Sequence, residues 1–280
     1  MKKIAKINKI IPFSNVDGPS NRMAIFFQGC PFDCLFCHNP ETINVCNNCG
    51  LCVETCPTKA LSIKDNEVIW NKDKCVNCDT CITKCPNNSS PKIMEMDIEE
   101  LLKEIKKTSP YIEGITTSGG ECTLYMDYLL ELFPKVKELG LSILLDSNGS
   151  YDFSNDNRLL DLIDGVMLDV KATNEKWSNE LIKYPNDIVL KNLEYLLEHN
   201  KLYEVRTVIF PDKDEDNKET IKYVSNIIKD KCDYKLIRYR PYGVREEYKK
   251  VVGLTTTSED YADKCVEYAI KCGATKAYYL

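Results

Sequence analysis

No run of apolar residues in this chain of 280 residues approaches the length of a membrane-spanning helix. The first 18 residues also lack an unbroken apolar stretch and a small-residue cleavage site, so we expect no secretory signal and a cytoplasmic location. Positive charge is limited as well, because 37 Lys and Arg face 43 Asp and Glu, which gives a net charge of -6. The sequence therefore argues against membrane surfaces and nucleic acids as partners.

Cysteine, by contrast, is abundant, with 15 residues in the chain. A large chain without a secretory signal seldom uses disulfides, so the cysteines favour metal ligation. Their spacing supports this interpretation, because eleven of them form three tight groups between Cys30 and Cys85. Three of the four scattered cysteines, Cys232, Cys265 and Cys272, are expected in the core, whereas Cys122 stays open between packing and a chemical role.

Helix and strand patterns alternate from about residue 92 onward, which is typical of a parallel sheet with crossover helices. Asp97 and Glu100 predict a capped helix start, and Gly140 predicts a left-handed helix end. Further helices are predicted near 187–199, 214–231 and 258–272. The predicted strands lie near 23–28, 114–118, 141–145, 166–170, 203–210 and 235–239. We therefore predict an α/β fold, a partial TIM-like (β/α)6 barrel.

Functional residues of such barrels lie at the carboxyl ends of the strands. Residues with chemical potential directly follow the predicted strands here: Cys30, Gly119–Glu121, Asp146–Asn148, Asp169–Lys171 and Arg240. Residues 44–91 break the rhythm with paired cysteine groups and Asn-rich turns. We predict a barrel from residues 1–43 and 92–280, with residues 44–91 as an insert in the loop after the first strand.

The insert contains the pattern C-x2-C-x2-C-x3-C-P twice, beginning at Cys46 and at Cys75. This is the spacing of bacterial ferredoxins with two clusters, in which the fourth cysteine of each run binds the other cluster. We predict two [4Fe–4S] clusters, held by Cys46, Cys49, Cys52 and Cys85, and by Cys56, Cys75, Cys78 and Cys81. A pair of zinc sites is the alternative. Closed clusters of this kind relay electrons or stabilise the insert, and we favour the relay.

The third group, Cys30, Cys34 and Cys37, offers only three thiolates. On a cubane cluster they leave one iron without a protein ligand, which indicates a reactive centre. Two alternatives remain open: a scattered cysteine that completes the cluster, and a zinc ion with three ligands.

The pattern C-x3-C-x-aromatic-C, with Phe36 as the aromatic residue, resembles the radical S-adenosylmethionine (SAM) superfamily. The resemblance implies that the open iron binds SAM and that reductive cleavage yields a 5'-deoxyadenosyl radical. Other motifs resemble the glycyl-radical-enzyme activating enzymes, of the pyruvate formate-lyase activase type. These motifs are FSNVDGPSNR at 13–22, CHNP at 37–40, GGE at 119–121, DSNG at 146–149 and MLDVK at 167–171. The two-cluster insert narrows the resemblance to activases with a ferredoxin-like domain, and the YjjW-type group is most similar.

The resemblance implies an oxygen-sensitive, anaerobic enzyme whose radical takes a hydrogen atom from a glycine of a partner glycyl radical enzyme. Reduced flavodoxin or ferredoxin would supply the electron, and we expect a monomer. Asp17 would face the partner. The residues that would contact SAM are Phe36, His38, Gly119, Gly120, Glu121, Ser147, Asp169, Lys171 and Arg206. A monovalent cation, Na+ or K+, would be held by Asp146, Ser147, Asp169 and the carbonyl of Met167.

Three positions depart from the family pattern. Ser20 replaces a usual glycine, Cys122 replaces the proline of GGEP, and Gly243 stands where a histidine often follows Pro-Tyr. The last two departures bear on the cofactor contacts, and none touches the cluster cysteines.

Two other functions are compatible with the sequence. A radical SAM maturase that modifies a peptide or metabolite is one, but such maturases often carry their additional clusters after the barrel. A ferredoxin-type electron carrier is the other, and it leaves Cys30, Cys34 and Cys37 unexplained.

Overall fold

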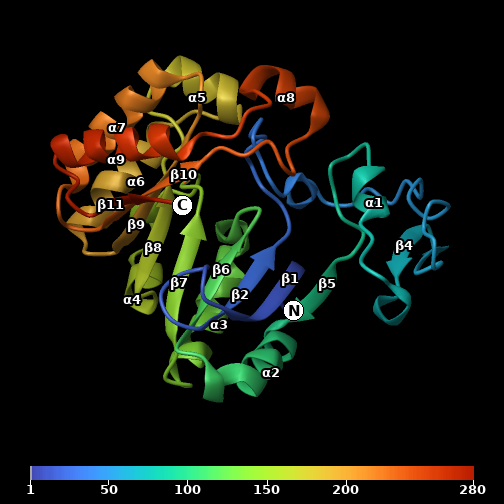
Figure 1. The fold of residues 1–280 in the computed structure, drawn as a ribbon. Helices are drawn as coiled ribbons and strands as arrows, with labels where there is room; N and C mark the ends of the chain where they lie inside the picture. The colour runs from blue at the N-terminus through green and yellow to red at the C-terminus, as the bar shows by residue number, and fades with distance from the viewer. Residues whose placement is uncertain (1) are drawn as a thin grey trace.

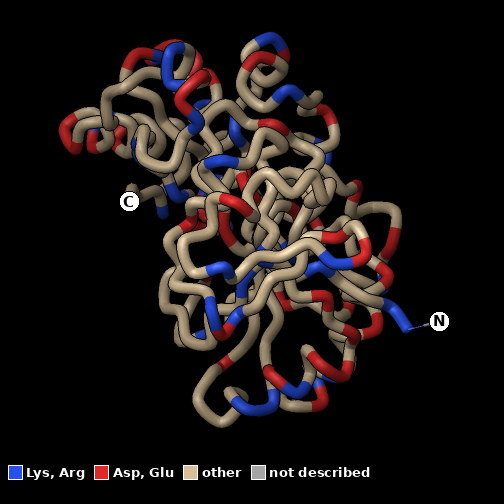
Figure 2. The backbone as a smooth tube through the Cα atoms, turned by 90° about the vertical axis from the view of Figure 1, so that its right-hand side faces the viewer, with Lys and Arg blue, Asp and Glu red and all other residues tan. Residues whose placement is uncertain are grey.

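The computed structural model describes residues 2–280. Residues 2–43 and 92–280 form a large α/β body, and residues 44–91 form a small lobe beside this body (Figure 1). Lys and Arg are interspersed with Asp and Glu over the side that Figure 2 presents, as the scattered charges of the sequence predict. In the described part of the chain, no helix is both long and apolar enough to cross a membrane, and the cytoplasmic location stays a prediction.

Within residues 2–280, nine strands form one curved sheet in the order β11-β10-β9-β8-β7-β6-β2-β1-β5. Its parallel core consists of the six predicted strands. These are β2 (Arg22–Phe27), β6 (Gly114–Gly119), β7 (Ser142–Ser147), β8 (Gly165–Asp169), β9 (Leu202–Ile209) and β10 (Asp233–Arg238). The predicted α/β fold with a mostly parallel sheet is therefore confirmed.

Three strands were not predicted, and all three extend the edges of the sheet. They are β1 (Ile4–Ser14), β5 (Met94–Asp97) and β11 (Ala277–Tyr279). Strand β1 pairs antiparallel with β2 on one side and with β5 on the other. Short edge strands show little periodicity, so no clear pattern predicts β5 and β11.

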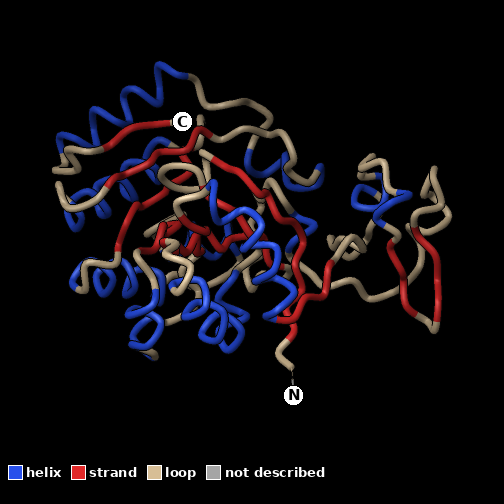
Figure 3. The backbone as a smooth tube through the Cα atoms, turned by 90° about the horizontal axis from the view of Figure 1, so that it is seen from below, coloured by secondary structure: helices blue, strands red, loops and turns tan. Residues whose placement is uncertain are grey.

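Helices cover the outer side of the curved sheet (Figure 3). The predicted ones are α2 (Ile98–Thr108), α3 (Met126–Lys137), α6 (Asp187–Glu198), α7 (Asp214–Ile228) and α9 (Glu259–Lys271). The body also contains α4 (Asn157–Leu162), α5 (Glu175–Ile182) and α8 (Glu246–Val252). Short 3-10 helices span Pro40–Thr42, Lys72–Lys74, Ser109–Tyr111, Cys122–Tyr125 and Phe153–Asn155.

Helix α2 illustrates how local sequence sets the elements. The Asp97 carboxylate accepts from the Glu100 backbone N–H, and the Glu100 carboxylate accepts from the Asp97 N–H, at 2.9 and 2.8 Å. This is the predicted capping box. At the end of α3, Gly140 has the predicted left-handed backbone, with φ of +74°.

The small lobe has a short hairpin, β3 (Leu61–Lys64) and β4 (Glu67–Trp70), and the single-turn helix α1 (Thr80–Thr83). A bridge between Asn44 and Ser89 closes the lobe where it joins the body. Its two halves repeat in backbone as in sequence, because Asn48 and Asn77 occupy equivalent positions in the cysteine runs and have φ of 59° and 53°. Asn tolerates this left-handed conformation better than most residues.

Candidate functional site

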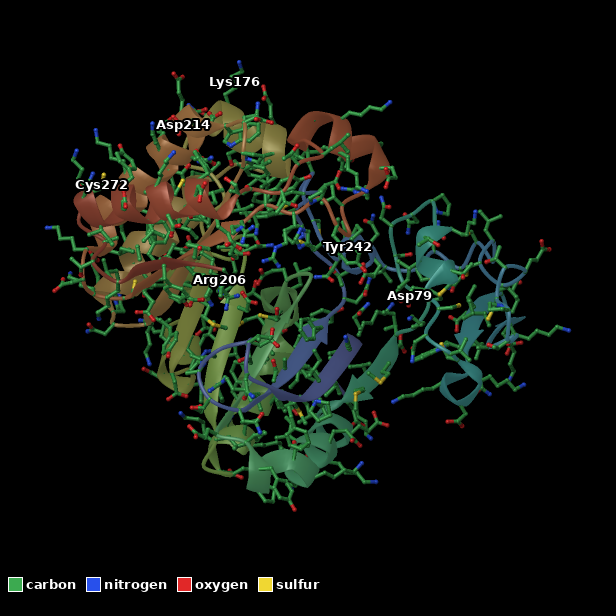
Figure 4. All side chains as sticks on the ribbon, in the orientation of Figure 1. Asp79, Lys176, Arg206, Asp214, Tyr242 and Cys272 are labelled. Atoms are coloured by element: carbon green, nitrogen blue, oxygen red, sulfur yellow. The ribbon has the colours of Figure 1, made fainter. Side chains whose placement is uncertain are left out.

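A central cavity of about 340 Å³ lies at the carboxyl ends of the parallel strands. Its size suits a small-molecule cofactor. The predicted site residues that line it are Asp17, Cys30, Cys34, Phe36, Cys37, His38, Gly119, Gly120, Asp146, Ser147, Asp169, Lys171 and Arg206. Figure 4 labels Arg206 within the barrel. The fold therefore brings together predicted residues as far apart in the chain as Asp17 and Arg206 in one cavity.

The loop that carries Cys30, Cys34 and Cys37 is held by backbone hydrogen bonds on both sides. The Cys30 N–H donates to the Ile43 carbonyl at 2.9 Å, and the Leu35 N–H donates to the Leu181 carbonyl at 2.8 Å. All three thiols border the cavity, and burial raises the pKa of each. Iron would therefore have to stabilise their thiolate forms, as a metal does for a coordinating thiol.

Sulfur ligands of a cluster commonly accept hydrogen bonds, and such a donor is present. The side-chain amide of Asn148 donates to the Cys30 sulfur at 3.4 Å. Three thiols, one amide donor and adjacent open space fit a [4Fe–4S] cluster with one open iron. Asn148 follows β7 and was not singled out by its side chain in the sequence, although its position at a strand end was the available signal.

A charged clamp, which the sequence analysis missed, holds the same loop from outside. Asp33 accepts from Lys183 at 2.7 Å and from Tyr248 at 3.3 Å, and it also pairs with Arg245. Burial would raise the pKa of Asp33, but Lys183 and Arg245 outweigh it and hold the pKa below its ordinary value. The clamp ties the cysteine loop to α8 and to the end of α5. Its only sequence signal was a carboxylate between two cluster cysteines.

Gly119 and Gly120 press against the backbone at the end of β2. A Cβ atom on Gly119 would lie 2.3 Å from the Phe27 backbone, and one on Gly120 would lie 2.2 Å from the Gly29 carbonyl oxygen. Gly119 also has φ of +116°. Glycine is required here for close backbone packing, which leaves the peptide units facing the cavity.

The Glu121 side chain does not reach the cavity, which corrects the prediction that its carboxylate lies beside SAM. It is 1 % exposed and accepts from the Thr123 and Ser147 hydroxyls and from the Thr123 and Asn148 N–H groups, at 2.7 to 3.1 Å. Four donors satisfy the buried carboxylate and join the loops after β6 and β7. The sequence does not reveal which way the chain turns after a glycine pair, so it does not indicate the direction of this side chain.

Four charged side chains alternate along the cavity wall. Arg206 pairs with Asp146 at 2.9 Å, and Lys171 pairs with Asp169 at 2.6 Å. Burial raises the pKa of Asp146, and Arg206 only partly offsets this effect. Burial would lower the pKa of Lys171, but Asp169 outweighs it, so the pKa of Lys171 lies above its ordinary value.

The oxygen atoms predicted to hold a monovalent cation already have partners. Asp146 also accepts from the Ser118 hydroxyl at 3.0 Å, and the Ser147 hydroxyl donates to Glu121. Met167 does not line the cavity, and its sulfur lies 3.0 Å from Arg206 Nη2. The donor atoms suit Na+ or K+ chemically, but the cation would have to compete with the Arg206 and Lys171 side chains.

His38 and Gly243 join the cysteine loop to the segment after β10. The His38 imidazole Nε2 lies 2.9 Å from the Arg240 carbonyl oxygen. Gly243 has φ of +79°, and a Cβ there would lie 2.8 Å from the His38 carbonyl oxygen. No histidine side chain could occupy this position without moving His38. The Arg240 side chain is exposed outside the cavity, which corrects its predicted place, and Arg238 lines the cavity instead.

The scattered cysteines do not complete the cluster site. Cys122 is fully buried, with its sulfur 3.9 Å from a Glu121 oxygen and from the Asp146 carbonyl, and it does not line the cavity. Packing is therefore its role. Cys232 and Cys265 are buried as predicted. Cys272 is only half-buried at the end of α9, at the far edge of the body (Figure 4), so its predicted core position was wrong.

The small lobe contains two further cavities, each lined by four cysteines. Cys46, Cys49, Cys52 and Cys85 line one of them, and Cys56, Cys75, Cys78 and Cys81 line the other. These are the two crossed sets that the ferredoxin spacing predicts. In the described residues, no group of three or more Cys, His, Asp or Glu side chains forms a site for a single metal ion.

The cavity of Cys56, Cys75, Cys78 and Cys81 also contains a buried polar atom without a partner. Trp70 lines it, and within residues 2–280 the indole Nε1 finds no hydrogen-bond acceptor. An unsatisfied buried donor is costly unless something accepts from it. Cluster sulfur atoms would provide acceptors, so this donor fits a bound cluster.

Comparison with known proteins identifies the class of enzyme. The family model described as the radical SAM superfamily matches residues 24–224. Two solved structures share the fold at low identity. QueE from Escherichia coli is 14% identical with a TM-score of 0.57, covering 99% of this chain and 94% of its own. SuiB from Streptococcus suis is 15% identical with a TM-score of 0.54, covering 90% of this chain and 47% of its own.

Curated relatives narrow the class. A putative glycyl-radical enzyme activating enzyme of Haemophilus influenzae is 28% identical, over 96% of this chain and 94% of its own. The trans-4-hydroxy-L-proline dehydratase activating enzyme of Clostridioides difficile is 31% identical, over 74% and 75%. The pyruvate formate-lyase-activating enzyme of Clostridium pasteurianum is 28% identical, over 85% and 82%. The chain belongs to the radical SAM superfamily and, within it, to the glycyl-radical-enzyme activating enzymes. Membership implies a [4Fe–4S] cluster and SAM.

Proposed function

We propose that this protein activates a partner glycyl radical enzyme by removing a hydrogen atom from one of its glycine residues. When bound, the cluster and SAM supply a 5'-deoxyadenosyl radical after one-electron reduction, with methionine as the leaving group. The hydrogen atom of the glycine α-carbon would end on 5'-deoxyadenosine, and the partner would keep a glycyl radical. The observation that carries the proposal is that Cys30, Cys34 and Cys37 line the same cavity as Asp17.

The chain's own side chains would bind and orient the cofactor. We propose that the peptide groups of Gly119 and Gly120 meet the methionine end of SAM, and that Lys171 offers its ammonium group to the SAM carboxylate. Phe36 lies 5.6 Å from the Lys171 Nζ and stacks edge-on against Phe210, so its ring shields one side of the cavity from water. His38 would lie beside the adenine. Asp17, which accepts from the Ser14 hydroxyl at 2.5 Å, would meet the substrate loop at the cavity mouth.

The test is direct detection of the product radical. The reduced, iron-loaded protein is incubated with SAM and a candidate glycyl radical enzyme, and electron paramagnetic resonance should record a glycine-centred doublet. A partner in which the target glycine is replaced by alanine is the control. Formation of 5'-deoxyadenosine without a doublet, with every candidate partner tried, would favour the maturase instead.

We further propose that residues 44–91 form a ferredoxin-like insert whose two cysteine sets hold [4Fe–4S] clusters, giving three clusters in all. Two cavities with four cysteines each support this proposal, as does the unpartnered Trp70 N–H. Fully ligated clusters cannot bind SAM, so their task would be to pass electrons from reduced flavodoxin or ferredoxin. The protein would act as a monomer.

Replacing Cys78 with alanine should remove one cluster only. We expect the iron content of the anaerobically reconstituted protein to fall from about twelve to about eight atoms per chain. Cleavage of SAM with dithionite should persist, whereas cleavage with flavodoxin should slow. Cys272→Ala is the matched control and should change neither quantity. An iron content of about four in the unaltered protein would refute the insert clusters.

A monovalent cation at Asp146, Ser147 and Asp169 also remains a proposal. Its binding requires Arg206 or Lys171 to move away from the carboxylates. Titration calorimetry of SAM in Na+, K+ and a bulky organic cation tests it, because identical affinities in all three would show that the side-chain cations suffice.

A further inference from the structure

A broad groove of about 950 Å³ lies between the small lobe and the edge of the large sheet. Its walls come from β1, β5 and α2 on the body and from the end of β4 and the segment around Asp79 on the lobe. Figure 1 shows the small lobe beside the β1 and β5 edge, and Figure 4 labels Asp79 on the side of the lobe that faces the body.

The groove adjoins one cysteine cavity and is separate from the central cavity. It shares Trp70, Asp79 and Lys92 with the cavity of Cys56, Cys75, Cys78 and Cys81. It shares no lining residue with the central cavity in the described part of the chain. The 3-10 helix Pro40–Thr42 separates the two, because Glu41 lines the groove while Thr42 lines the central cavity.

The lining of the groove has a small excess of positive charge, with four lysines against three carboxyl groups, although the chain as a whole is negative. Two of its lysines are neutralised, since Lys92 pairs with Asp79 and Lys107 pairs with Glu104, each at 2.5 Å. Lys9 and Lys72 are exposed and form no ion pair within residues 2–280. The remaining carboxyl group of the lining belongs to the half-buried Glu41, which leaves the lining with an excess of one lysine over its carboxyl groups. Two free ammonium groups therefore face solvent at this site.

Trp70 provides the contact between the groove and the cysteine cavity. Its side chain lines both, so a molecule in the groove and a cluster in the cavity would be separated by little more than this ring and the Lys92 side chain. The shared wall gives an electron a short path from the outside of the protein to the four cysteine sulfurs.

We propose that this groove is the docking surface of the electron donor, a small acidic redox protein that delivers one electron at a time. The inference rests on the proposed insert clusters. The donor loses one electron and the cluster of Cys56, Cys75, Cys78 and Cys81 gains it, with no proton or group transferred. The charge of the groove favours an acidic partner and speeds its association. The substrate enzyme must reach the central cavity, so both proteins can bind together.

The test reverses the two free charges in the iron-loaded, full-length protein. We expect Lys9→Glu with Lys72→Glu to lower the initial rate of 5'-deoxyadenosine formation with reduced flavodoxin about tenfold at low salt. The difference should shrink as KCl is added, because salt screens exposed charges. With dithionite as the reductant, the variant and the unaltered protein should react at the same rate.

The matched control is Lys222→Glu with Lys264→Glu, on α7 and α9, which changes the net charge equally at the opposite side of the sheet. Equal flavodoxin rates for the two double variants would overturn the proposal. A loss of glycyl radical formation with dithionite as well would assign the groove to the substrate enzyme instead. An iron content of about four atoms per chain in the unaltered protein would refute the insert clusters themselves, so the two failures are distinguishable.

Discussion

Replacing Cys34 with alanine should lower the rate of reductive SAM cleavage by about 10³-fold or more, the scale of losing an essential catalytic group. Cys34 is the most buried of the three thiols, with 7 % of its surface exposed, and the Asp33 clamp and the Leu35 hydrogen bond fix its position. No other sulfur can replace it, because none of the four unassigned cysteines, Cys122 among them, lines the cavity in the described part of the chain. The measurement is 5'-deoxyadenosine formation with dithionite, by chromatography.

The control for this variant is Cys122→Ala, which removes a buried sulfur next to the site without touching the cavity. We expect it to keep its iron and to cleave SAM within a few-fold of the normal rate, with a modest loss of stability from the small cavity left behind. Two results would contradict this assignment. One is a Cys34 variant that still turns over, and the other is a Cys122 variant that loses its cluster.

Replacing Glu121 with glutamine should destabilise the protein by about 2–4 kcal/mol, because the new amide group would face N–H and O–H donors inside the core. For a chain of this size the midpoint of thermal unfolding should fall by roughly 5–15 °C. Calorimetry of the protein in the absence of SAM measures the effect. Glu104→Gln is the control, since its exposed pair with Lys107 should contribute less than about 1 kcal/mol.

This experiment also separates two roles for Glu121. A carboxylate that contacts SAM would weaken SAM binding while the unfolding midpoint stayed unchanged. If the carboxylate joins the loops after β6 and β7, its replacement would lower the unfolding midpoint. The affinity for SAM would then also fall, because Gly119, Gly120 and Asn148 would no longer be held in place. We expect the second result.

Sequence patterns were informative where the signal is local or periodic. The six parallel strands, the capped start of α2 and the glycine that ends α3 follow from residues within a few positions of each other. The edge strands β5 and β11 are four and three residues long and were missed, since so few residues show no reliable alternation. Cysteine spacing predicted which thiols share a cavity, because a cluster constrains its ligands at fixed intervals.

Side-chain direction beyond the strand ends was less predictable. Arg240 was placed in the barrel, but β10 ends at Arg238, so the chain leaves the sheet before Arg240 and its side chain faces solvent. The clamp on Asp33 joins residues about 150 and 212 positions away, and no pattern in one sequence reports such contacts. The groove beside Trp70 depends on how the lobe packs near β1 and β5. Local sequence patterns do not report this packing either.

By itself the sequence determined the order of the six parallel strands and of the longer helices, the three cysteine groups and the family, because each depends on residue type and spacing along the chain. Only the tertiary structure decided that Glu121 joins two loops, that Arg206 and Lys171 pair with the carboxylates proposed to hold a cation, and that Lys9 and Lys72 line one groove beside a cysteine cavity. Burial and charge pairing act between segments that are distant in the chain. Their effects therefore exist only after the sheet has curved and the lobe has docked.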